Sequence, residues 1–459
     1  MEDFEPVETP TPPVAKRRPL FRKDVLSAIL RLSWPAVLEQ VLLMMGGLVV
    51  TMFLGKRGNA ELAAAALVNM VVVVQQTAFA GLATGATVII ARVIGEGDDR
   101  KARSALFQAL VMGLAISGAI TVLTYLFADP ILSVFFGPNS ADAAALAPSY
   151  FRILLYAMPF MVLDMTIAAS MRGAGDTATP MVVSGIGAAL NVGLCFLLIG
   201  PMGIVGAGIA LTVSRITTAA LRVTLMFAYR KVLYLLPRER YRIDRVLMAR
   251  IFRQGLPAFL EQAVMQGGFL MMSWLLTGLG TAEYDSWQVG VNMNSMAFMP
   301  IFGLAVATTT YVGQALGAGR LEDAADGVKE SVRVAVVTIT LLGILAAVFA
   351  DPIARMFTND PEVVRKGVEL IRFFAVLEPL LAIMNVCAGT LRAGGDIIFV
   401  TWTAFVGLWV FRVLVSFLMI RFVGLGLEGV MVGTAMDFVA RAALYGQRVR
   451  RGRWKHKRV

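Results

Sequence analysis

The sequence predicts an all-α integral membrane protein with twelve transmembrane helices in two pseudo-symmetric lobes of six. The first observation is composition: 58% of the 459 residues are hydrophobic and only 16% are charged, whereas a soluble chain is about 25% charged. The second is a set of twelve apolar runs, each near the length of about 20 residues that a membrane-spanning helix needs. The third is an internal repeat that divides the chain in half.

The apolar runs form two sets of six. They are rich in Gly and Ala and lack the ten-residue alternation of a membrane β-barrel, so helices are the way for their backbone to be satisfied in lipid. The runs of the first set lie near 33–54, 62–92, 105–128, 146–171, 180–200 and 203–229. Those of the second set lie near 255–280, 287–313, 331–350, 369–391, 397–420 and 424–445.

The repeat is clearest in PAVLEQ at 35–40 and PAFLEQ at 257–262, a spacing of 222 residues. FADPI recurs at 127–131 and 349–353 with the same spacing. Because each half has an even number of spans, the halves are related by a pseudo-twofold axis along the membrane normal. This places the two Glu residues of the motif at the same depth and favours rocking of one lobe against the other.

The basic residues indicate the orientation. Half of the 42 Lys and Arg residues lie in 1–32, in 230–253 and after Tyr445, and these segments share one side of a twelve-span protein. By the positive-inside rule that side is cytoplasmic, so both termini are expected inside, with the chain in the inner (plasma) membrane. The predicted divisions are a tail with an interfacial helix (1–32), the N-lobe (33–229), a linker (230–254), the C-lobe (255–445) and a basic tail (446–459).

The basic C-terminal tail RVRRGRWKHKRV has two interpretations. It is compatible with nucleic acid or with anionic lipid, but a charge run beside a span usually reports orientation. We therefore expect membrane lipids and no nucleic acid as partners of the tail. The segment before the first span and the segment before the seventh both resemble amphipathic helices at the inner interface.

Glu39 and Glu261 are the predicted ion-coupling residues. An ionisable side chain in mid-membrane costs about 2.5 to 3.5 kcal/mol on insertion scales and usually faces the bundle interior or a water-filled cavity. Two such carboxylates, facing one another across a hydrated vestibule, could exchange a proton or a cation on each cycle, which is the chemistry of an antiporter. The alternative is that each is protonated or paired and only joins helices.

Further polar residues lie inside the predicted spans. Asp164 is at about the depth of Glu39, and either joins the ion path or pairs with an arginine such as Arg215. Residues that could contact a bulky cation through amide, cation-π or hydrogen-bonding groups are also present. The candidate substrate-binding residues are Gln40, Gln262, Gln266, Asn191, Trp274 and Asn292.

The sequence disfavours enzymatic and metal chemistry. Its one histidine, His456, is in the tail, and Cys195 and Cys387 lie alone in different predicted helices. A catalytic site would need a clustered nucleophile and base or a set of metal ligands. We expect no enzyme, no metal and no cofactor beyond H+ or Na+ as the coupling ion; a passive channel is the other alternative to a transporter.

Several motifs resemble those of the multidrug and toxic compound extrusion (MATE) transporters. They are MRGAGDTATP at 171–180 with its echo LRAGGD at 391–396, GIVGAG at 203–208, and MPIFGLAVATTTYVGQALGAG at 299–319. With the twelve spans they cover nearly the whole chain. The resemblance implies two six-helix lobes around a V-shaped cleft, and export of organic cations driven by inward H+ or Na+.

The chain also departs from that family's ion sites. A carboxylate that often ends the first span is replaced by Val50, and an Asp four residues after Asn191 is replaced by Cys195. In the seventh and tenth spans, Met265 and Leu381 stand where one branch has acidic residues. This leaves Glu39 and Glu261 as the candidate coupling pair.

The sequence thus predicts a monomeric, cation-coupled antiporter that exports amphipathic organic cations by alternating access. A flippase for lipid-linked intermediates is the main alternative within transport. We set it below the antiporter because such proteins have a strongly cationic cavity, while the deep charges placed from the sequence are mainly acidic. The six-plus-six major facilitator architecture is disfavoured because GEGDDRKA matches its basic signature poorly.

Overall fold

The computed structural model describes residues 23–135, 141–228, 233–236, 239, 241–358 and 360–457, which form helices joined by short turns. The predicted N-terminal tail up to residue 22 lies outside this description. The first half contains α1 (Lys23–Arg57), α2 (Asn59–Glu96), α3 (Asp99–Leu126), α4 (Ala128–Phe135), α5 (Ala141–Gly173) and α6 (Ala178–Ala228). The second half contains α7 (Arg245–Thr277), α8 (Thr281–Gly317), α9 (Leu321–Val348), α10 (Ala350–Arg355), α11 (Pro361–Ala393), α12 (Ile397–Phe405), η2 (Val406–Leu414), α13 (Val415–Leu418), η3 (Met419–Val423), α14 (Leu427–Arg450) and η4 (Arg453–His456).

Twelve spans result because α6 crosses twice. Its 51 residues would extend about 76 Å as one straight helix, more than twice the hydrocarbon thickness of about 30 Å. The helix is interrupted at Gly203, whose φ of 57° and ψ of −136° are not helical. A side chain there would be strained, so the glycine lets the chain reverse. In the described residues nine helices, α6 among them, are long and apolar enough to cross a membrane; α7 and α14, with 33 and 24 residues, supply the remaining spans.

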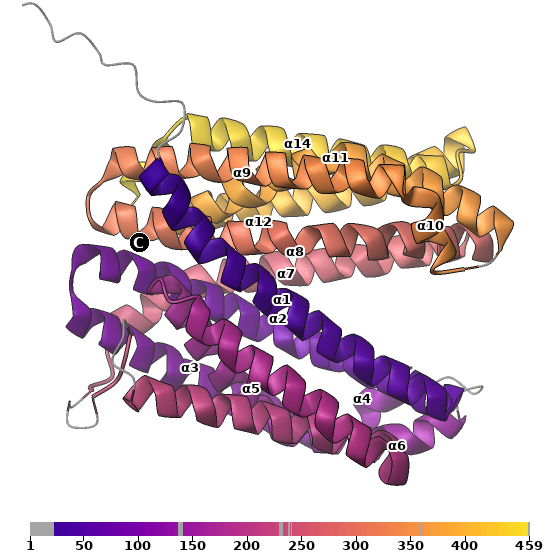
Figure 1. The fold of residues 1–459 in the computed structure, drawn as a ribbon, viewed down its shortest axis with the longest axis horizontal. Helices are drawn as coiled ribbons and strands as arrows, with labels where there is room; N and C mark the ends of the chain where they lie inside the picture. The colour runs from indigo at the N-terminus through magenta and orange to yellow at the C-terminus, as the bar shows by residue number, and fades with distance from the viewer. Residues whose placement is uncertain are drawn as a thin grey trace, which may run out of the picture.

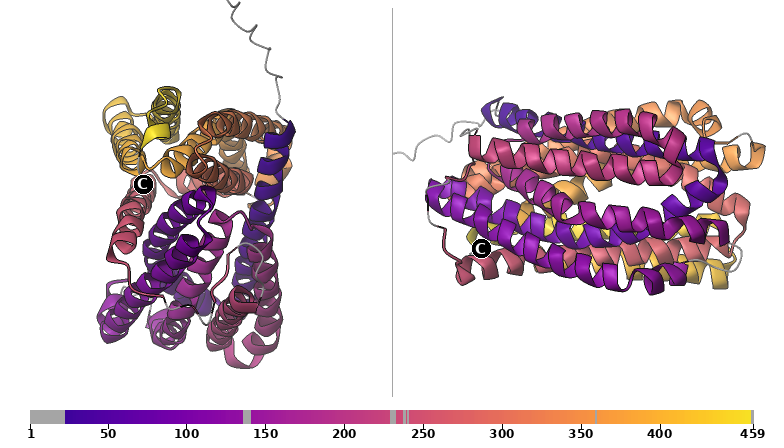
Figure 2. Two further views of the ribbon diagram at one scale, coloured as in Figure 1. Left: turned by 90° about the vertical axis from the view of Figure 1, so that its left-hand side faces the viewer. Right: turned by 90° about the horizontal axis from the view of Figure 1, so that it is seen from below.

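The two halves form separate bundles (Figure 1). The bundles lie close together at the end that carries the C-terminus and diverge toward the other end in this view. The left-hand view of Figure 2 looks at the bundles from the end that carries the C-terminus, with most of the first half (indigo to magenta) below most of the second half (salmon to yellow). Each bundle has its own apolar cores, such as that of Leu54, Phe79 and Tyr150 in the first half.

The first helix of each half crosses to the opposite lobe. Val25 and Ile29 of α1 belong to a core made mainly of second-half residues. Leu247 and Ile251 of α7, each 222 residues later, belong to a core of the first half. The segments expected to be separate interfacial helices are therefore the first turns of α1 and α7, because their apolar faces pack on protein rather than on lipid.

Glycines allow this crossing on both sides of the axis. A Cβ on Gly81 of α2 would lie 2.6 Å from the backbone nitrogen of Phe259 in α7. A Cβ on its repeat mate, Gly303 of α8, would lie 2.9 Å from the backbone nitrogen of Val37 in α1. Residue 37 is also the mate of residue 259, so the two crossings are the same contact made twice, as in an isologous interface.

The axis itself passes near Gly95 and Gly317, which are repeat mates. A Cβ on Gly317 would lie 2.0 Å from the Arg92 carbonyl oxygen and 3.0 Å from the Gly95 Cα. A Cβ on Gly95 would lie 2.1 Å from the carbonyl oxygen of Gln314, the mate of Arg92. Only glycine permits this approach, which closes the two lobes at the end that carries the C-terminus.

The basic C-terminal tail is folded against this closed end. Trp454 is 1% exposed and packs on Gly394 at the end of α11. The Lys457 ammonium pairs with Asp396, which also receives a hydrogen bond of 2.7 Å from Arg448. The Lys457 carbonyl accepts a hydrogen bond of 2.9 Å from Arg92 of α2. Up to Lys457 the tail is thus part of the protein and joins the two lobes.

Replacing Gly317 by Ala tests the closed end. The new Cβ would meet backbone atoms that cannot rotate away, and we expect overpacking to destabilise the protein by about 1 to 3 kcal/mol. The control is Gly47→Ala in α1, where no atom lies within 4 Å of the added Cβ. Thermal unfolding of the purified protein should show a lower midpoint for Gly317→Ala and no loss for the control. Equal unfolding midpoints for the two variants would mean that Gly317 does not pack against Gly95.

We expect the C-terminal tail to detach from the closed end at low pH. Burial by itself would raise the pKa of Asp396, but hydrogen bonds from Arg448 and Lys457 outweigh it and hold the pKa below the ordinary value. A depressed carboxylate pKa stabilises the folded form above the unfolded pKa of about 3.9, and that contribution is lost as pH falls through the folded pKa. Trp454 emission, obtained by subtracting a Trp454→Phe variant, should therefore change only below about pH 4. A transition between pH 5 and 7 would contradict this assignment.

Candidate functional site

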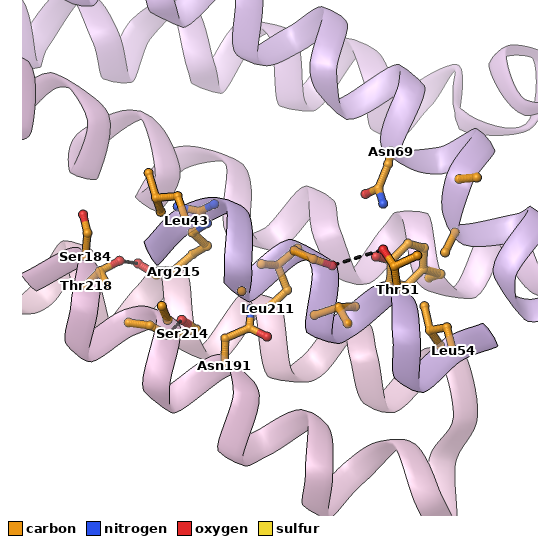
Figure 3. A pocket seen from close by; sticks show the side chains of 18 of the residues that line it. Leu43, Thr51, Leu54, Asn69, Ser184, Asn191, Leu211, Ser214, Arg215 and Thr218 are labelled. Atoms are coloured by element: carbon orange, nitrogen blue, oxygen red, sulfur yellow. Dashed lines mark hydrogen bonds between the residues drawn. The ribbon is translucent and has the colours of Figure 1, made fainter. Parts of the chain in front are cut away.

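A cavity of about 260 Å³ lies inside the N-lobe, between α1, α2, α5 and α6 (Figure 3). Its wall combines apolar side chains from α1 and α2 with polar side chains from α5 and α6. Glycines 46 and 47 of α1 and 187 of α6 contribute no side chain, which leaves room between the helices. The polar and charged lining residues are Thr51, Asn69, Tyr150, Asp164, Ser184, Asn191, Ser214, Arg215 and Thr218.

Glu39 lies beside this cavity and is held in place by two hydrogen-bond donors and a further ion pair. Its carboxylate accepts hydrogen bonds of 2.9 Å from Arg172 at the end of α5 and of 2.9 Å from the Ser184 hydroxyl of α6. The Arg222 guanidinium of α6 lies 3.5 Å away. Glu39 is 3% exposed, so this carboxylate is buried and paired within its own lobe.

Asp164 of α5 pairs with the same arginine. Arg222 Nη1 lies 2.5 Å from Asp164 Oδ1 and donates its hydrogen bond of 3.1 Å to the Asp164 carbonyl oxygen; the carboxylate contact is an ion pair without hydrogen-bond geometry. Arg222 also donates to the Pro180 carbonyl and to Ser184. At 2% exposure it is the centre of the cluster. The sequence left open whether Asp164 pairs with an arginine; it does, and the partner is Arg222 rather than Arg215.

Arg215 of α6 differs from its neighbours. Within the described residues no carboxylate lies within 4 Å of its guanidinium, and no hydrogen bond from its side chain is found. Asp164 attracts it and Arg222 repels it. Its side chain borders the cavity and extends toward Leu43 of α1 (Figure 3). We define the N-lobe charge cluster as Glu39, Asp164, Arg172, Arg215 and Arg222: two carboxylates and three guanidinium groups.

Glu261 repeats the pairing of Glu39 in the C-lobe. Arg392 Nη2 at the end of α11 lies 2.5 Å from Glu261 Oε1 of α7, with 13% of the Glu261 side chain exposed. Arg172 and Arg392 are the arginines of MRGAGD and LRAGGD, so a repeated acid pairs with a repeated base. Both carboxylates are thus bound to arginines of their own lobes.

A second buried charge cluster lies deeper in the C-lobe. Asp437 of α14 is fully buried and pairs with Arg441 on the same helix and, at 2.9 Å, with Arg412 of η2. The Arg412 guanidinium stacks over the Phe438 ring, with 5.0 Å to the centroid. Wider π-helical turns over Val406–Leu414 bring Arg412 to this position, as such turns often do at functional sites.

Glu378 of α11 is a buried acid of another kind. It is 2% exposed, and its Oε2 has no hydrogen-bond partner. No basic side chain of the described chain lies within 4 Å of it. A Cβ on Gly343 of α9 would lie 2.7 Å from Glu378 Oε2, so the glycine makes room for the carboxyl group. An unpaired carboxylate in such a place is costly, and the neutral acid is the form that burial favours.

The candidate substrate-binding residues are dispersed. Asn191 lines the N-lobe cavity, where its side-chain oxygen accepts a contact of 3.2 Å from the Cys195 thiol. Trp274 is 67% exposed on α7. None of the other four lines that cavity: Gln40 and Gln266 are half-buried, and Gln262 and Asn292 are exposed.

The arginines are what the sequence reasoning missed. It placed mainly acidic groups deep in the spans, and this is wrong: Arg215, Arg222, Arg412 and Arg441 are all inside helices that cross the membrane. The signal was present, since an ionisable residue within an apolar run is a functional candidate by default. Arg222, Arg412 and Arg441 had been left aside, and Arg215 had been considered only as a partner for Asp164.

The acidic residues do not gather into a metal site. In the part of the chain that the structure describes, no group of three or more His, Cys, Asp or Glu side chains is placed to hold a metal ion. Around Glu39 the neighbouring groups are two guanidinium groups and a hydroxyl: Arg172 and Ser184 donate hydrogen bonds to the carboxylate, and Arg222 makes an ion pair with it. Such surroundings favour an anion or a proton acceptor over a metal cation.

Arg222 and Arg215 make a matched pair for testing the cluster. Arg222→Met removes the partner of two buried carboxylates, and breaking a buried ion pair costs about 3 to 5 kcal/mol. Arg215→Met on the same helix removes no ion pair, and we expect a change under about 1 kcal/mol. Unfolding midpoints of the two purified variants should differ accordingly. Equal losses would show that Arg215 also has a carboxylate partner.

Comparison with known proteins agrees with the fold and the motifs. A family model described as MatE matches residues 35–197 and 257–418, the two halves of the repeat. The chain is 29% identical over 450 residues to a probable multidrug resistance protein NorM of Thermotoga maritima, covering 95% of this chain and 94% of that one. It is 25% identical to the probable multidrug resistance protein YoeA of Bacillus subtilis, covering 93% of both.

Solved structures share the architecture. One is described as the outward-facing conformation of a multidrug resistance MATE family transporter of the MOP superfamily. It superposes with a TM-score of 0.87 at 23% identity, covering 94% of this chain and 97% of that chain. The predicted twelve-helix, two-lobe fold is confirmed.

Proposed function

Because the chain belongs to the MATE family of membrane transporters, we propose that it exports small molecules by ion-coupled alternating access. The family is one of transporters and not of enzymes, and its members move small-molecule substrates across the membrane as multi-pass proteins. The named relatives support multidrug efflux as the activity. The proposal adds antiport, inner-membrane location, both termini on the cytoplasmic side and a monomeric chain.

The observation that carries the coupling proposal is the repeated acid–arginine pair. Glu39 and Glu261 occupy equivalent positions on the two crossing helices, α1 and α7. Each is bound by an arginine in the last turn of a helix of its own lobe, Arg172 of α5 or Arg392 of α11. Protonation neutralises a carboxylate and weakens its ion pair. The state of the acid can therefore be transmitted to the helix that connects the lobes.

Arg172 shows how the signal would reach the other lobe. Its side chain binds Glu39, while its backbone carbonyl accepts a hydrogen bond of 2.9 Å from Thr310 of α8. The next carbonyl, that of Gly173, accepts one of 3.1 Å from Gln314. Release of Glu39 would loosen the residue that joins α5 to α8 at the closed end, and the lobes could separate there.

The surroundings of the acids favour H+ over Na+ as the coupling ion. A bound Na+ requires several oxygen ligands, whereas Glu39 is surrounded by guanidinium groups. At an effective dielectric constant of about 20, two unit charges 4 Å apart interact by about 4 kcal/mol, so two arginines would repel a metal cation strongly. A proton avoids this because it removes the carboxylate charge without adding a cation.

The substrate proposed from the sequence is an amphipathic organic cation, with Gln40, Gln262, Gln266, Asn191, Trp274 and Asn292 as the candidate binding residues and Asp164 as part of the ion path. In the structure, Asp164 is paired with Arg222. The deep arginines also remove the argument that ranked the lipid-linked flippase below the antiporter, namely that the deep charges are mainly acidic. The N-lobe charge cluster nevertheless has a net charge of only one, far from the strongly cationic cavity that a pyrophosphate lipid requires. A small-molecule exporter remains the function that the geometry supports best.

Glu39→Gln and Glu261→Gln test the coupling. Each variant keeps a side chain of the same shape but cannot ionise, and we expect gradient-driven export of ethidium from proteoliposomes to be lost while expression is kept. Glu369→Gln is the matched control, because Glu369 lies on the surface of α11 and its ion pair within the described chain is with Arg365.

An imposed pH gradient should drive export by the wild type and the control, and a protonophore should abolish it. Dependence on Na+ instead would overturn the choice of H+. Full export by the Glu39→Gln/Glu261→Gln double variant would refute the coupling assignment.

A further inference from the structure

One positive charge in the N-lobe charge cluster is unmatched. Arg172 and Arg222 share Glu39, and Arg222 also takes Asp164. This uses both carboxylates and leaves Arg215 without one in the described chain. A guanidinium group cannot release its proton in a protein, so the charge persists whether or not the acids are protonated.

The unmatched charge is accessible from the cavity. Arg215 lies 12 residues after the reversal at Gly203, about 18 Å along the second part of α6 at 1.5 Å per residue, which places it in mid-membrane. It borders the cavity together with Ser214 and Thr218 of the same helix. A buried charge of this kind is usually paired, and the empty side of this guanidinium faces the cavity.

Other donors face the same space. The amide nitrogens of Asn69 on α2 and Asn191 on α6 have no hydrogen-bond partner among the described residues, and both side chains border the cavity (Figure 3). The hydroxyl protons of Thr51, Ser214 and Thr218 are donated to backbone carbonyls. Among the described residues, the free donors of the wall are therefore two amides, the Tyr150 hydroxyl and one guanidinium, a set that recognises an anion.

Among the described residues of this wall, no carboxylate is free to bind a cation. Asp164 borders the cavity, but Arg222 lies 2.5 Å from its Oδ1, and Glu39 is bound by two hydrogen-bond donors and an ion pair. A cationic ligand would have to displace Arg222 from Asp164 while lying near Arg215. The charge of the wall opposes such a ligand.

We propose that the N-lobe cavity binds the carboxylate of a small amphipathic organic acid, with Arg215 as the residue that anchors it. The planar guanidinium fork matches a carboxylate with two parallel hydrogen bonds. The inference rests on the proposed export function and changes its substrate class from an organic cation to an organic anion or a zwitterion.

The charge of the wall and the volume of the cavity limit the class of ligand further. One unmatched positive charge balances a monoanion, whereas a phosphate monoester or a pyrophosphate would carry charge that nothing in this wall neutralises. At about 260 Å³ the cavity is smaller than the usual range of about 300 to 1,000 Å³ for drug-sized ligands. Leu43, Val50, Leu54 and Leu211 supply the apolar part of the wall, which suits a carboxylate carried on one compact aromatic or aliphatic group.

Three probes with one ring system and different charges test the proposal. They are 1-naphthoate, the neutral 1-naphthamide and the cationic 1-naphthylmethylammonium, each titrated into the purified full-length protein in detergent by calorimetry at constant chloride. We expect naphthoate to bind more tightly than the amide and the ammonium to bind more weakly than the amide. The reverse order would overturn the proposal.

Substitution of Arg215 locates the site. Arg215→Gln should weaken naphthoate binding about ten- to a hundred-fold, the value of hydrogen bonds to a charged group, and leave naphthamide binding unchanged. Arg215→Lys should keep part of the affinity and shows that loss in Arg215→Gln is not misfolding. The matched control is Arg152→Gln, since Arg152 lies on the surface and pairs with Asp129. Naphthoate affinity that is unchanged in Arg215→Gln would refute the site.

Asp164→Asn distinguishes an anion site from a cation site by the sign of its effect. Loss of this carboxylate makes the cavity more positive, so naphthoate should bind several-fold more tightly. If the cavity were a cation site, the same variant would weaken 1-naphthylmethylammonium and leave naphthoate unaffected, and that result would contradict the proposal.

Export assays separate this inference from the proposed function. If a pH gradient drives export of ethidium but naphthoate neither binds nor moves, the transporter assignment stands and the anion site fails. If naphthoate binds through Arg215 but neither probe is exported under any gradient, the site stands and the export function fails.

Discussion

A deeply placed charge in this bundle must be paired, hydrogen-bonded or left facing a cavity, because lipid offers it no partner. The repeated acid–arginine pair is the main response to that constraint. Glu39 binds α1 to the end of α5, and Glu261 binds α7 to the end of α11. Since the first turns of α1 and α7 pack on the opposite lobes, each of these helices is fixed to both lobes at once. The close contacts of Gly81 with α7 and of Gly303 with α1 are part of that arrangement.

The duplication accounts for the two similar lobes, and the positions at which the two repeats differ account for the cavity in the N-lobe. GIVGA at 203–207 and GLEGV at 426–430 are 223 residues apart, and at this spacing Ser214 and Thr218 correspond to Asp437 and Arg441. In the C-lobe these positions are filled by a buried ion pair completed by Arg412. In the N-lobe they carry small hydroxyl side chains that border empty space. One lobe thus closes its core with its own charges, and the other leaves an arginine facing a cavity.

Sequence alone predicted the fold well, since apolar runs and a repeat depend only on local composition and on spacing. It also singled out Glu39, Glu261 and Asp164, each of which pairs with an arginine of its own lobe. It did not predict their partners, because Arg172 is 133 residues from Glu39 along the chain and which faces of α1, α5 and α6 meet depends on helix rotation. The tail was read from its charge as a lipid-facing segment, but the buried Trp454 and the acceptor Asp396 make it part of the folded core. Only the three-dimensional arrangement shows such contacts.

The location of the pairs limits how coupling can work. The partners of Glu39 in the described chain belong to α5 and α6 of the N-lobe, and the partner of Glu261 belongs to α11 of the C-lobe. A rigid rocking of the lobes therefore leaves both clusters intact and cannot by itself sense protonation. The exception is the crossing helix: Pro35 lies one turn before Glu39, and a proline inside a helix removes a backbone hydrogen bond and favours a bend. A change in the charge of Glu39 can therefore reach the interface between the lobes through the bend of α1 and through Arg172, whose carbonyl is bound by Thr310.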